Sequence, residues 1–67
     1  MTPRRLSTVI RELREAQGMT QLDLAKKAKV AQGYISSLEA GEKKNPGVQI
    51  LRKLAKALDV PVGRLLE

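Results

Sequence analysis

The side chains best suited to chemistry lie between residues 30 and 41, which read VAQGYISSLEAG. Ile35 and Leu38 are apolar at the spacing of one helix face. The opposite half of that helix carries four short or amide-bearing residues: Gln32, Gly33, Ser36 and Ser37. This half has hydrogen-bonding groups, no charge and little bulk, which is what contact with base edges in the major groove of DNA requires. An ordinary polar helix face is the alternative reading of the same pattern.

Each of the four residues has a distinct use in reading bases. Gln32 holds the first exposed position, where a glutamine amide can form two hydrogen bonds with adenine. Ser36 and Ser37 can contact either bases or phosphates. Gly33 has no side chain to offer but lets the backbone come close to a partner. We therefore predict these four as the base-reading residues.

Composition excludes several other kinds of chemistry. The 67 residues, too few for more than one domain (1–67), include no Cys and no His. Disulfides, thiolate catalysis and nearly all zinc or iron sites are therefore excluded, and we predict no metal and no cofactor. Without a glycine-rich phosphate loop or paired carboxylates, an enzyme is not expected. No apolar run approaches the roughly 20 residues that span a bilayer, so we expect a cytoplasmic protein.

The charge balance indicates a polyanionic partner. Thirteen Lys and Arg residues against seven Asp and Glu give a net charge of +6. Nucleic acid is the commonest partner of such chains, although a basic balance can also serve solubility alone. A membrane surface is disfavoured because the basic residues are spread over several helices and no Trp or Phe is present to anchor them.

Apolar spacing and helix breakers predict five short helices and no strand, hence a compact all-α domain with helices packed at steep angles. Thr2 and Pro3 begin the first helix and Gly18 ends it, while Thr20 and Asp23 cap the second. The third covers about residues 31–40, the fourth follows the Asn-Pro-Gly loop at 45–47, and a short turn closes the chain. The inward-facing positions are predicted to be Leu6, Val9, Ile10, Leu13, Ala16, Leu24, Ala25, Ala28, Val48, Leu51, Leu54, Ala55, Leu58, Val60, Val62, Leu65 and Leu66.

Residues 20–41, TQLDLAKKAKVAQGYISSLEAG, form the informative unit. The turn between its two helices is too short for an antiparallel pair, so the helices must cross at a large angle as a helix-turn-helix. Ala25 stands where the two helices come closest, and its small side chain permits that approach.

Residues 9–66 resemble the DNA-binding domain of lambda-repressor and Cro-type regulators, the Xre helix-turn-helix family. The segments that carry the resemblance are IRELREAQGMTQLDLAKKAKV, YISSLEAGEKKNP and LRKLAKALDVPVGRLL. The resemblance implies a lambda-repressor-like fold in which the third helix enters the major groove of double-stranded DNA. It also implies that the second helix lies across the backbone.

The resemblance assigns further residues to the DNA backbone. It implies that Gln21 bonds a phosphate and steadies Gln32, at a helix start capped by Thr20 where free N–H groups favour anions. The loop residues implied to contact phosphates are Lys43, Lys44 and Asn45. A solvated charge cluster is the alternative for this loop. Tyr34, the only aromatic residue, is expected to turn its hydroxyl towards solvent or phosphate, and a purely structural role is equally open.

Arg14 and Glu39 match a pair that the family forms between its first and third helices, which positions the reading helix more than it stabilises the fold. Two separate surface charges are the alternative for these residues. The chain also departs from the family at three positions. Lys29 replaces the usual glycine of the turn, so it must adopt a left-handed conformation. Ala31 and Gly47 replace the Ser or Thr caps of the third and fourth helices.

The same resemblance implies a homodimer, with two reading helices on one face of a pseudo-palindromic operator. The residues predicted for the dimer contact are Val62, Leu65 and Leu66. The leading interpretation is a sequence-specific transcriptional regulator, typically a repressor. The alternative is an antitoxin-like module that uses the fold to bind a protein partner, which the apolar Leu22 favours slightly.

Overall fold

Five α-helices make up the regular structure of the computed structural model, which describes residues 6–42 and 46–66. They are α1 (Leu6–Ala16), α2 (Gln21–Ala28), α3 (Gln32–Glu39), α4 (Val48–Ala57) and α5 (Val62–Leu66). The predicted five-helix, all-α architecture is confirmed. The predicted cap at Thr2 and Pro3 lies outside the described residues.

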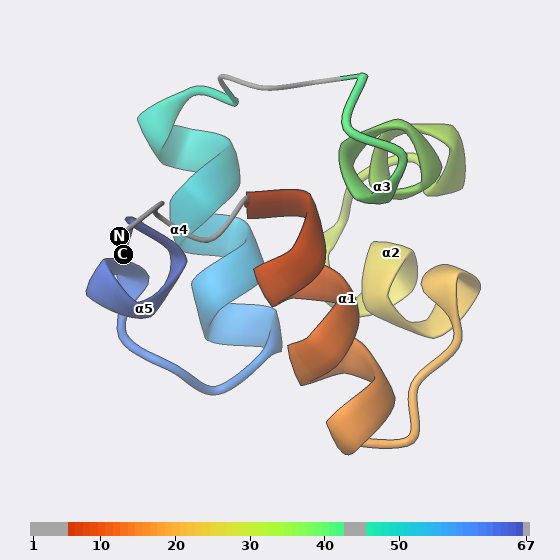
Figure 1. The fold of residues 1–67 in the computed structure, drawn as a ribbon, viewed down its shortest axis with the longest axis horizontal. Helices are drawn as coiled ribbons and strands as arrows, with labels where there is room; N and C mark the ends of the chain where they lie inside the picture. The colour runs from red at the N-terminus through yellow and green to blue at the C-terminus, as the bar shows by residue number, and fades with distance from the viewer. Residues whose placement is uncertain (1–5, 43–45, 67) are drawn as a thin grey trace.

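A single core joins the helices. Figure 1 shows α1 crossing in front of the others, with α4 and α5 on one side and α2 and α3 on the other. The largest fully buried side chains are Ile10, Leu24, Ile35, Leu38, Leu54 and Leu58. Each such side chain contributes about 1.5–3 kcal/mol by leaving water. Within this core α3 packs against α1 and α2, so it cannot shift without disturbing those two helices.

Two predicted core positions are wrong. Ala16 is exposed, and Val48 keeps 62% of its surface exposed. Ala16 ends α1 and Val48 begins α4. Apolar spacing continues to the last residue of a helix, whereas the packing partners need not extend so far.

The chain leaves each of the first four helices through the same kind of turn. Each turn contains one residue in the left-handed conformation: Gly18 (φ 71°), Lys29 (φ 60°), Gly41 (φ 82°) and Asp59 (φ 57°). In each turn the next N–H bonds a carbonyl five residues earlier, as Val30 N donates to Ala25 O at 3.0 Å. This arrangement closes the helix end with its own carbonyls. The predicted left-handed conformation of Lys29 is confirmed.

The turn between α2 and α3 is short because of this closure. Val30, directly after Lys29, packs against the core, and Ala25, a small residue of α2, is buried within that core. The helix-turn-helix therefore depends on one strained residue and one small one.

Replacing Lys29 with glycine should increase stability. A non-glycine residue in the left-handed region costs about 1–2 kcal/mol, part of which glycine loses again through its greater freedom in the unfolded chain. We expect Lys29→Gly to raise the free energy of unfolding, measured in urea, by about 0.5–1 kcal/mol. The matched control is Lys27→Gly, an exposed position inside α2, which should lower it by about 1 kcal/mol. Destabilisation by both changes would contradict the assigned strain.

Candidate nucleic-acid interface

Glu39, in the last turn of α3, is the one buried charged residue within the described ranges, with 4% of its surface exposed. Arg14 of α1 holds its carboxylate with two hydrogen bonds. Arg14 Nε donates to Oε2 at 2.7 Å and Nη2 donates to Oε1 at 2.9 Å. Gln21 of α2 adds a third, from Nε2 to Oε1 at 3.1 Å. Three helices therefore meet at one carboxylate.

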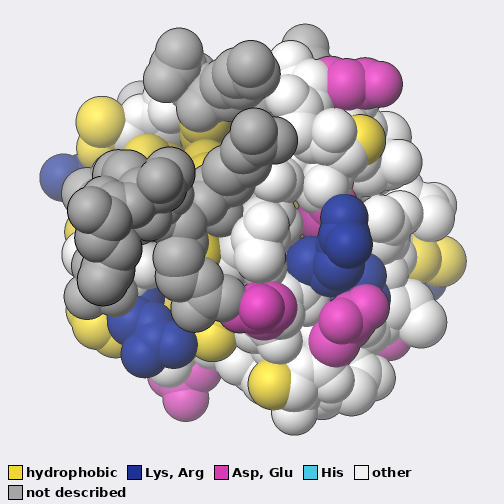
Figure 2. All heavy atoms as spheres, viewed as in Figure 1, with side chains coloured by type: hydrophobic (Ala, Val, Ile, Leu, Met, Phe, Trp, Pro, Cys, Tyr) yellow, Lys and Arg dark blue, Asp and Glu magenta, His cyan; other side chains and the backbone are white. Residues whose placement is uncertain are grey.

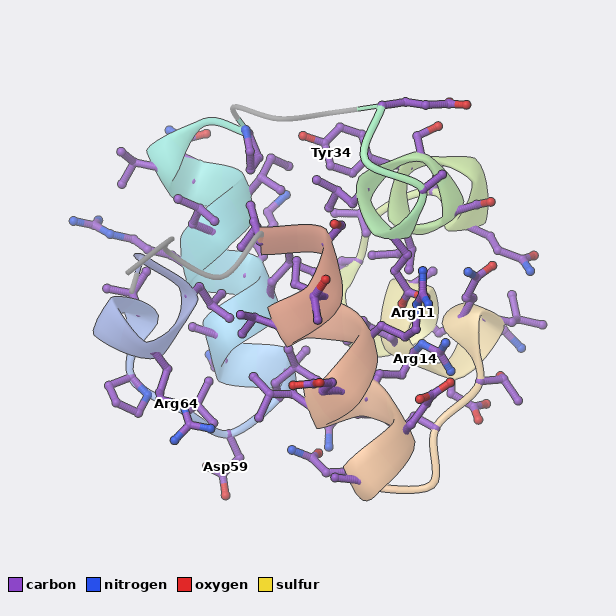
Figure 3. The ribbon with its side chains drawn as sticks, viewed as in Figure 1. Arg11, Arg14, Tyr34, Asp59 and Arg64 are labelled. Atoms are coloured by element: carbon purple, nitrogen blue, oxygen red, sulfur yellow. The ribbon has the colours of Figure 1, made fainter. Side chains whose placement is uncertain are left out.

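Two further hydrogen bonds extend this network to the backbone. Arg14 Nη1 donates to the carbonyl of Met19 at 2.7 Å, which fixes the turn between α1 and α2. Arg11 Nη2 donates to the carbonyl of Glu39 at 3.1 Å, at the end of α3. Arg11 and Arg14 project from α1 towards the neighbouring α2 and α3 in Figure 3. On the same face of the molecule, cations and carboxylates lie near one another in Figure 2.

The carboxylate of Glu39 stays ionised in this setting. Burial alone would raise the pKa of Glu39, but hydrogen bonds from Arg14 and Gln21 and the charges of Arg14 and Arg11 together outweigh it. The pKa of Glu39 therefore lies below its ordinary value. The hydrogen bond to Glu39 also raises the pKa of Arg14. Both partners remain charged at neutral pH.

The outward side of α3 is a narrow ridge. Gln32, Gly33 and Ser36 are exposed, whereas Ile35, Leu38 and Glu39 are buried on the opposite side. A Cβ atom added at Gly33 would meet nothing within 4 Å, so the fold itself does not require glycine there. Ser37 is half-buried, so the ridge is narrower than the four residues predicted from the sequence. Below, the outward ridge means Gln32, Gly33 and Ser36.

The start of α3 has no side-chain cap. Ala31 occupies the cap position and is exposed, and no side chain bonds the first N–H groups of the helix. These groups are left for water or for an anion. The start of α4 has the same property, with Gly47 as its cap residue.

The start of α2, by contrast, is capped as predicted. Asp23 N donates to Thr20 Oγ1 at 3.0 Å, and Thr20 N donates to Asp23 Oδ2 at 2.9 Å. Hydrogen bonds that the backbone N–H and the side chain of Thr20 make to the carboxylate lower the pKa of Asp23. Gln21 is half-buried beside this cap and uses one amide hydrogen on Glu39. Its second amide hydrogen can serve another acceptor.

The remaining predicted site residues have varied positions. Tyr34 is half-buried with its ring against the core. Lys43, Lys44 and Asn45 lie outside the described residues. Leu65 keeps only 3% of its surface exposed within the monomer. Its assignment to the dimer contact is therefore corrected: it closes the core, because α5 packs against both α4 and α1.

The other two members of the predicted dimer contact are Val62 and Leu66. Val62 is half-buried against the core, and the side chain of Leu66 is outside the description. Sequence reasoning missed Arg11, whose spacing three residues before Arg14 on one helix face could have indicated it.

In the described part of the chain no three carboxylates gather to hold a metal ion. No described helix is long and apolar enough to cross a membrane.

Comparison with known proteins defines the class of this domain. The Helix-turn-helix family HTH_3 matches residues 10–65. A relative, the HTH-type transcriptional regulator SinR of Bacillus subtilis, is 41% identical over 58 residues, covering 87% of this chain and 52% of its own. HigA2 of Mycobacterium tuberculosis, a candidate antitoxin, is 43% identical over 73% of this chain and 48% of its own. The chain thus spans about half the length of these curated relatives.

Two solved structures share the fold closely. SinR in complex with DNA has a TM-score of 0.89 and 39% identity, covering 92% of this chain and 98% of that one. The restriction-modification controller protein C.AhdI of Aeromonas hydrophila has a TM-score of 0.85 and 33% identity, covering 90% and 89%. This chain belongs to the helix-turn-helix family of lambda-repressor and Cro-type (Xre) domains.

The lowered pKa of Glu39 predicts a loss of stability in acid. A carboxyl whose pKa is lower in the folded state stabilises the fold fully above its ordinary pKa, 4.5. That contribution is lost as the pH falls through the lower folded-state pKa. We expect the free energy of unfolding to fall as the pH drops below 4.5 and through the lower folded-state pKa of Glu39. In the Glu39→Gln variant the free energy of unfolding should be lower at neutral pH and should fall less as the pH drops.

Asp23→Asn is the control for this prediction. Asp23 is exposed and has its own lowered pKa, so this variant should remove a separate part of the acid dependence and keep the part due to Glu39. NMR titration of the Glu39 carboxyl in the unmodified protein gives an independent check. A Glu39 pKa at or above 4.5 would contradict the network described above.

Proposed function

We propose that this chain is a sequence-specific transcriptional regulator that binds double-stranded DNA by placing α3 in the major groove. The observation that carries the proposal is the outward ridge of α3, fixed by Glu39 in a domain that matches SinR in complex with DNA. The ridge is exposed, uncharged and hydrogen-bonding. A helix that faces only water gains nothing from such a composition.

Each ridge residue makes a different contact in the proposed base recognition. Gln32, in the first turn of α3, can form two hydrogen bonds with adenine, and Ser36 lies one turn further along. Gly33 between them leaves open space, so a base pair or its methyl group can approach the helix backbone. Ser37, half-buried at the edge of the ridge, is better placed for a phosphate than for a base.

Backbone contacts come from the helix starts that flank the ridge. Gln21 is held by Glu39 through one amide hydrogen and can donate the other to a phosphate oxygen. Thr20 is exposed beside it and is proposed for the same phosphate role. We extend the phosphate role to Tyr34 and to the loop residues Lys43, Lys44 and Asn45, on the resemblance alone. The uncapped N–H groups of α3 favour the same polyanion.

The proposal includes a homodimer on a pseudo-palindromic operator and a cytoplasmic location. One ridge of three residues reads too few base pairs for useful specificity, and two ridges related by a two-fold axis double the number. With Leu65 in the core, the dimer contact falls to the exposed part of Val62 and to Leu66.

Alanine variants of the ridge and of α2 test the proposal. A preferred site is first selected from a random duplex pool, and affinities are then measured by fluorescence anisotropy. Gln32→Ala should cost about 1–3 kcal/mol per half-site on the selected duplex and little on random duplex. Gln21→Ala, a phosphate contact, should weaken both duplexes to a similar extent.

Serine substitutions supply a matched pair. Ser36→Ala removes a hydroxyl from the ridge, and Ser7→Ala removes one from α1. Only the first should change affinity for the selected duplex. Failure to select any preferred duplex at low ionic strength, or equal effects of Ser36→Ala and Ser7→Ala, would refute base reading by α3.

One observation favours a second function, the binding of a protein partner. Leu22, on the first turn of α2, keeps 43% of its surface exposed, an apolar group at the edge of the proposed interface. The similarity to HigA2 agrees with this reading. A partner complex that survives Gln32→Ala and Gln21→Ala but is lost in Leu22→Glu would support it.

A further inference from the structure

A shallow depression of about 330 Å³ lies between the last turns of α2 and α4. Among the described residues that line it, Ala28 and Ala57 are the two that are not lysines, and both are buried with small side chains that leave the hollow open. The remaining lining consists of Lys27, Lys29, Lys53 and Lys56. None of the outward ridge of α3 lines it, so this hollow is separate from the proposed base-reading surface.

The four lysines have no partners of opposite charge. Within the described ranges none of their ammonium groups forms an ion pair or a hydrogen bond. Lys26 and Arg52 stand next to them in sequence, and Asp23 is the only carboxylate on α2 and α4. The α1 face differs, because carboxylates are interspersed with its cations (Figure 2). The α2–α4 surface is thus strongly basic.

The helix ends account for only part of this charge. Both α2 and α4 end beside the hollow, and each helix end carries about half a negative charge. Two such ends balance about one of the four cations. The terminal carbonyls are also already engaged, since Val30 N donates to Ala25 O and Val60 N to Ala55 O, both at 3.0 Å. About three positive charges therefore remain uncompensated around one hollow.

We propose that this hollow binds a compact polyphosphate anion. Lysine ammonium groups act as mobile point charges with three donors each, which suits phosphate oxygens in many orientations. The described lining offers no arginine fork for a planar carboxylate and no aromatic ring for a base. The volume lies near the lower limit, about 300 Å³, of small-molecule sites.

A linear chain of a few phosphates fits this hollow better than a DNA backbone does. The chain concentrates about four negative charges in one small volume, which matches four cations. A duplex spreads its phosphates along two strands and can place few of them over one hollow. The proposed anion site is independent of DNA reading by α3, and each proposal is tested separately.

Thermal unfolding with and without tripolyphosphate tests the site, with ionic strength held constant by sodium chloride. The melting temperature should rise with tripolyphosphate and saturate, as expected for binding to the folded state. Lys53→Gln and Lys27→Gln should each weaken the apparent Kd about fivefold, the effect of one exposed charge contact. The matched controls Arg52→Gln and Lys26→Gln, on the same helices but outside the lining, should change it less than about twofold.

The melting temperatures without anion separate a binding site from simple compensation of the helix ends. Because the four cations repel one another, Lys53→Gln should melt at the same or a slightly higher temperature than the unmodified protein. Lysines that serve only the helix ends would lower it when removed. A lower melting temperature combined with unchanged tripolyphosphate affinity would overturn the proposal.

Two other results would also overturn it. Equal loss of affinity in all four variants would mean a diffuse charge effect with no site. Mutual displacement of tripolyphosphate and a short duplex, with Lys53→Gln weakening both equally, would mean that the hollow is a DNA backbone contact. Simultaneous binding of tripolyphosphate and duplex, with only tripolyphosphate sensitive to Lys53, supports the separate site.

Discussion

The structure depends on one buried carboxylate. Glu39 belongs to the helix that presents the outward ridge, and its oxygens are held by Arg14 from α1 and Gln21 from α2. Removing both charges from water is costly, so the pair stabilises the fold less than its short distances suggest. Removing a single partner is another matter, because it leaves the other charge buried and unpaired at a cost of about 3–5 kcal/mol. The benefit of the intact pair is therefore position: it fixes where α3 lies against α1 and α2, and it orients Gln21 beside the ridge.

The helix ends supply the second constraint. Each of the first four helices is followed by one left-handed residue, and the N–H of the next residue bonds a carbonyl of the helix. Such turns are short enough for helices of 5 to 11 residues to surround one small core. Lys29 performs this role with some strain, directly before the exposed start of α3. Helix α3 is thus held firmly at its Glu39 end, and the N–H groups at its uncapped start are left for a partner.

Local features of the sequence predicted most of the fold, and features that depend on distant packing were missed. Helical spacing predicted five helices and the Thr20–Asp23 pair predicted a cap, both from neighbouring positions. The left-handed conformation of Lys29 was predicted from the family resemblance, because the family usually has glycine at that position. Asp59 adopts the same left-handed conformation without a glycine to mark it. The burial of Leu65, the half-burial of Ser37 and the lysine-lined hollow require knowledge of how α5 meets α1 or how α2 meets α4. The ridge was predicted because its residue types are unusual for a water-facing helix, and its recognition role stays a proposal.

Our central proposal is that the Arg14–Glu39 pair positions α3 for reading DNA. Its most direct test is the ratio of affinities for the selected duplex and for random duplex in the double variant Arg14→Met/Glu39→Leu. Because apolar residues of similar size often replace a buried ion pair without loss of stability, this variant should remain folded. With α3 and Gln21 no longer fixed by the carboxylate, the ratio should fall at least about tenfold, the equivalent of 1.4 kcal/mol. A folded double variant with the full ratio of the unmodified protein would contradict the claim.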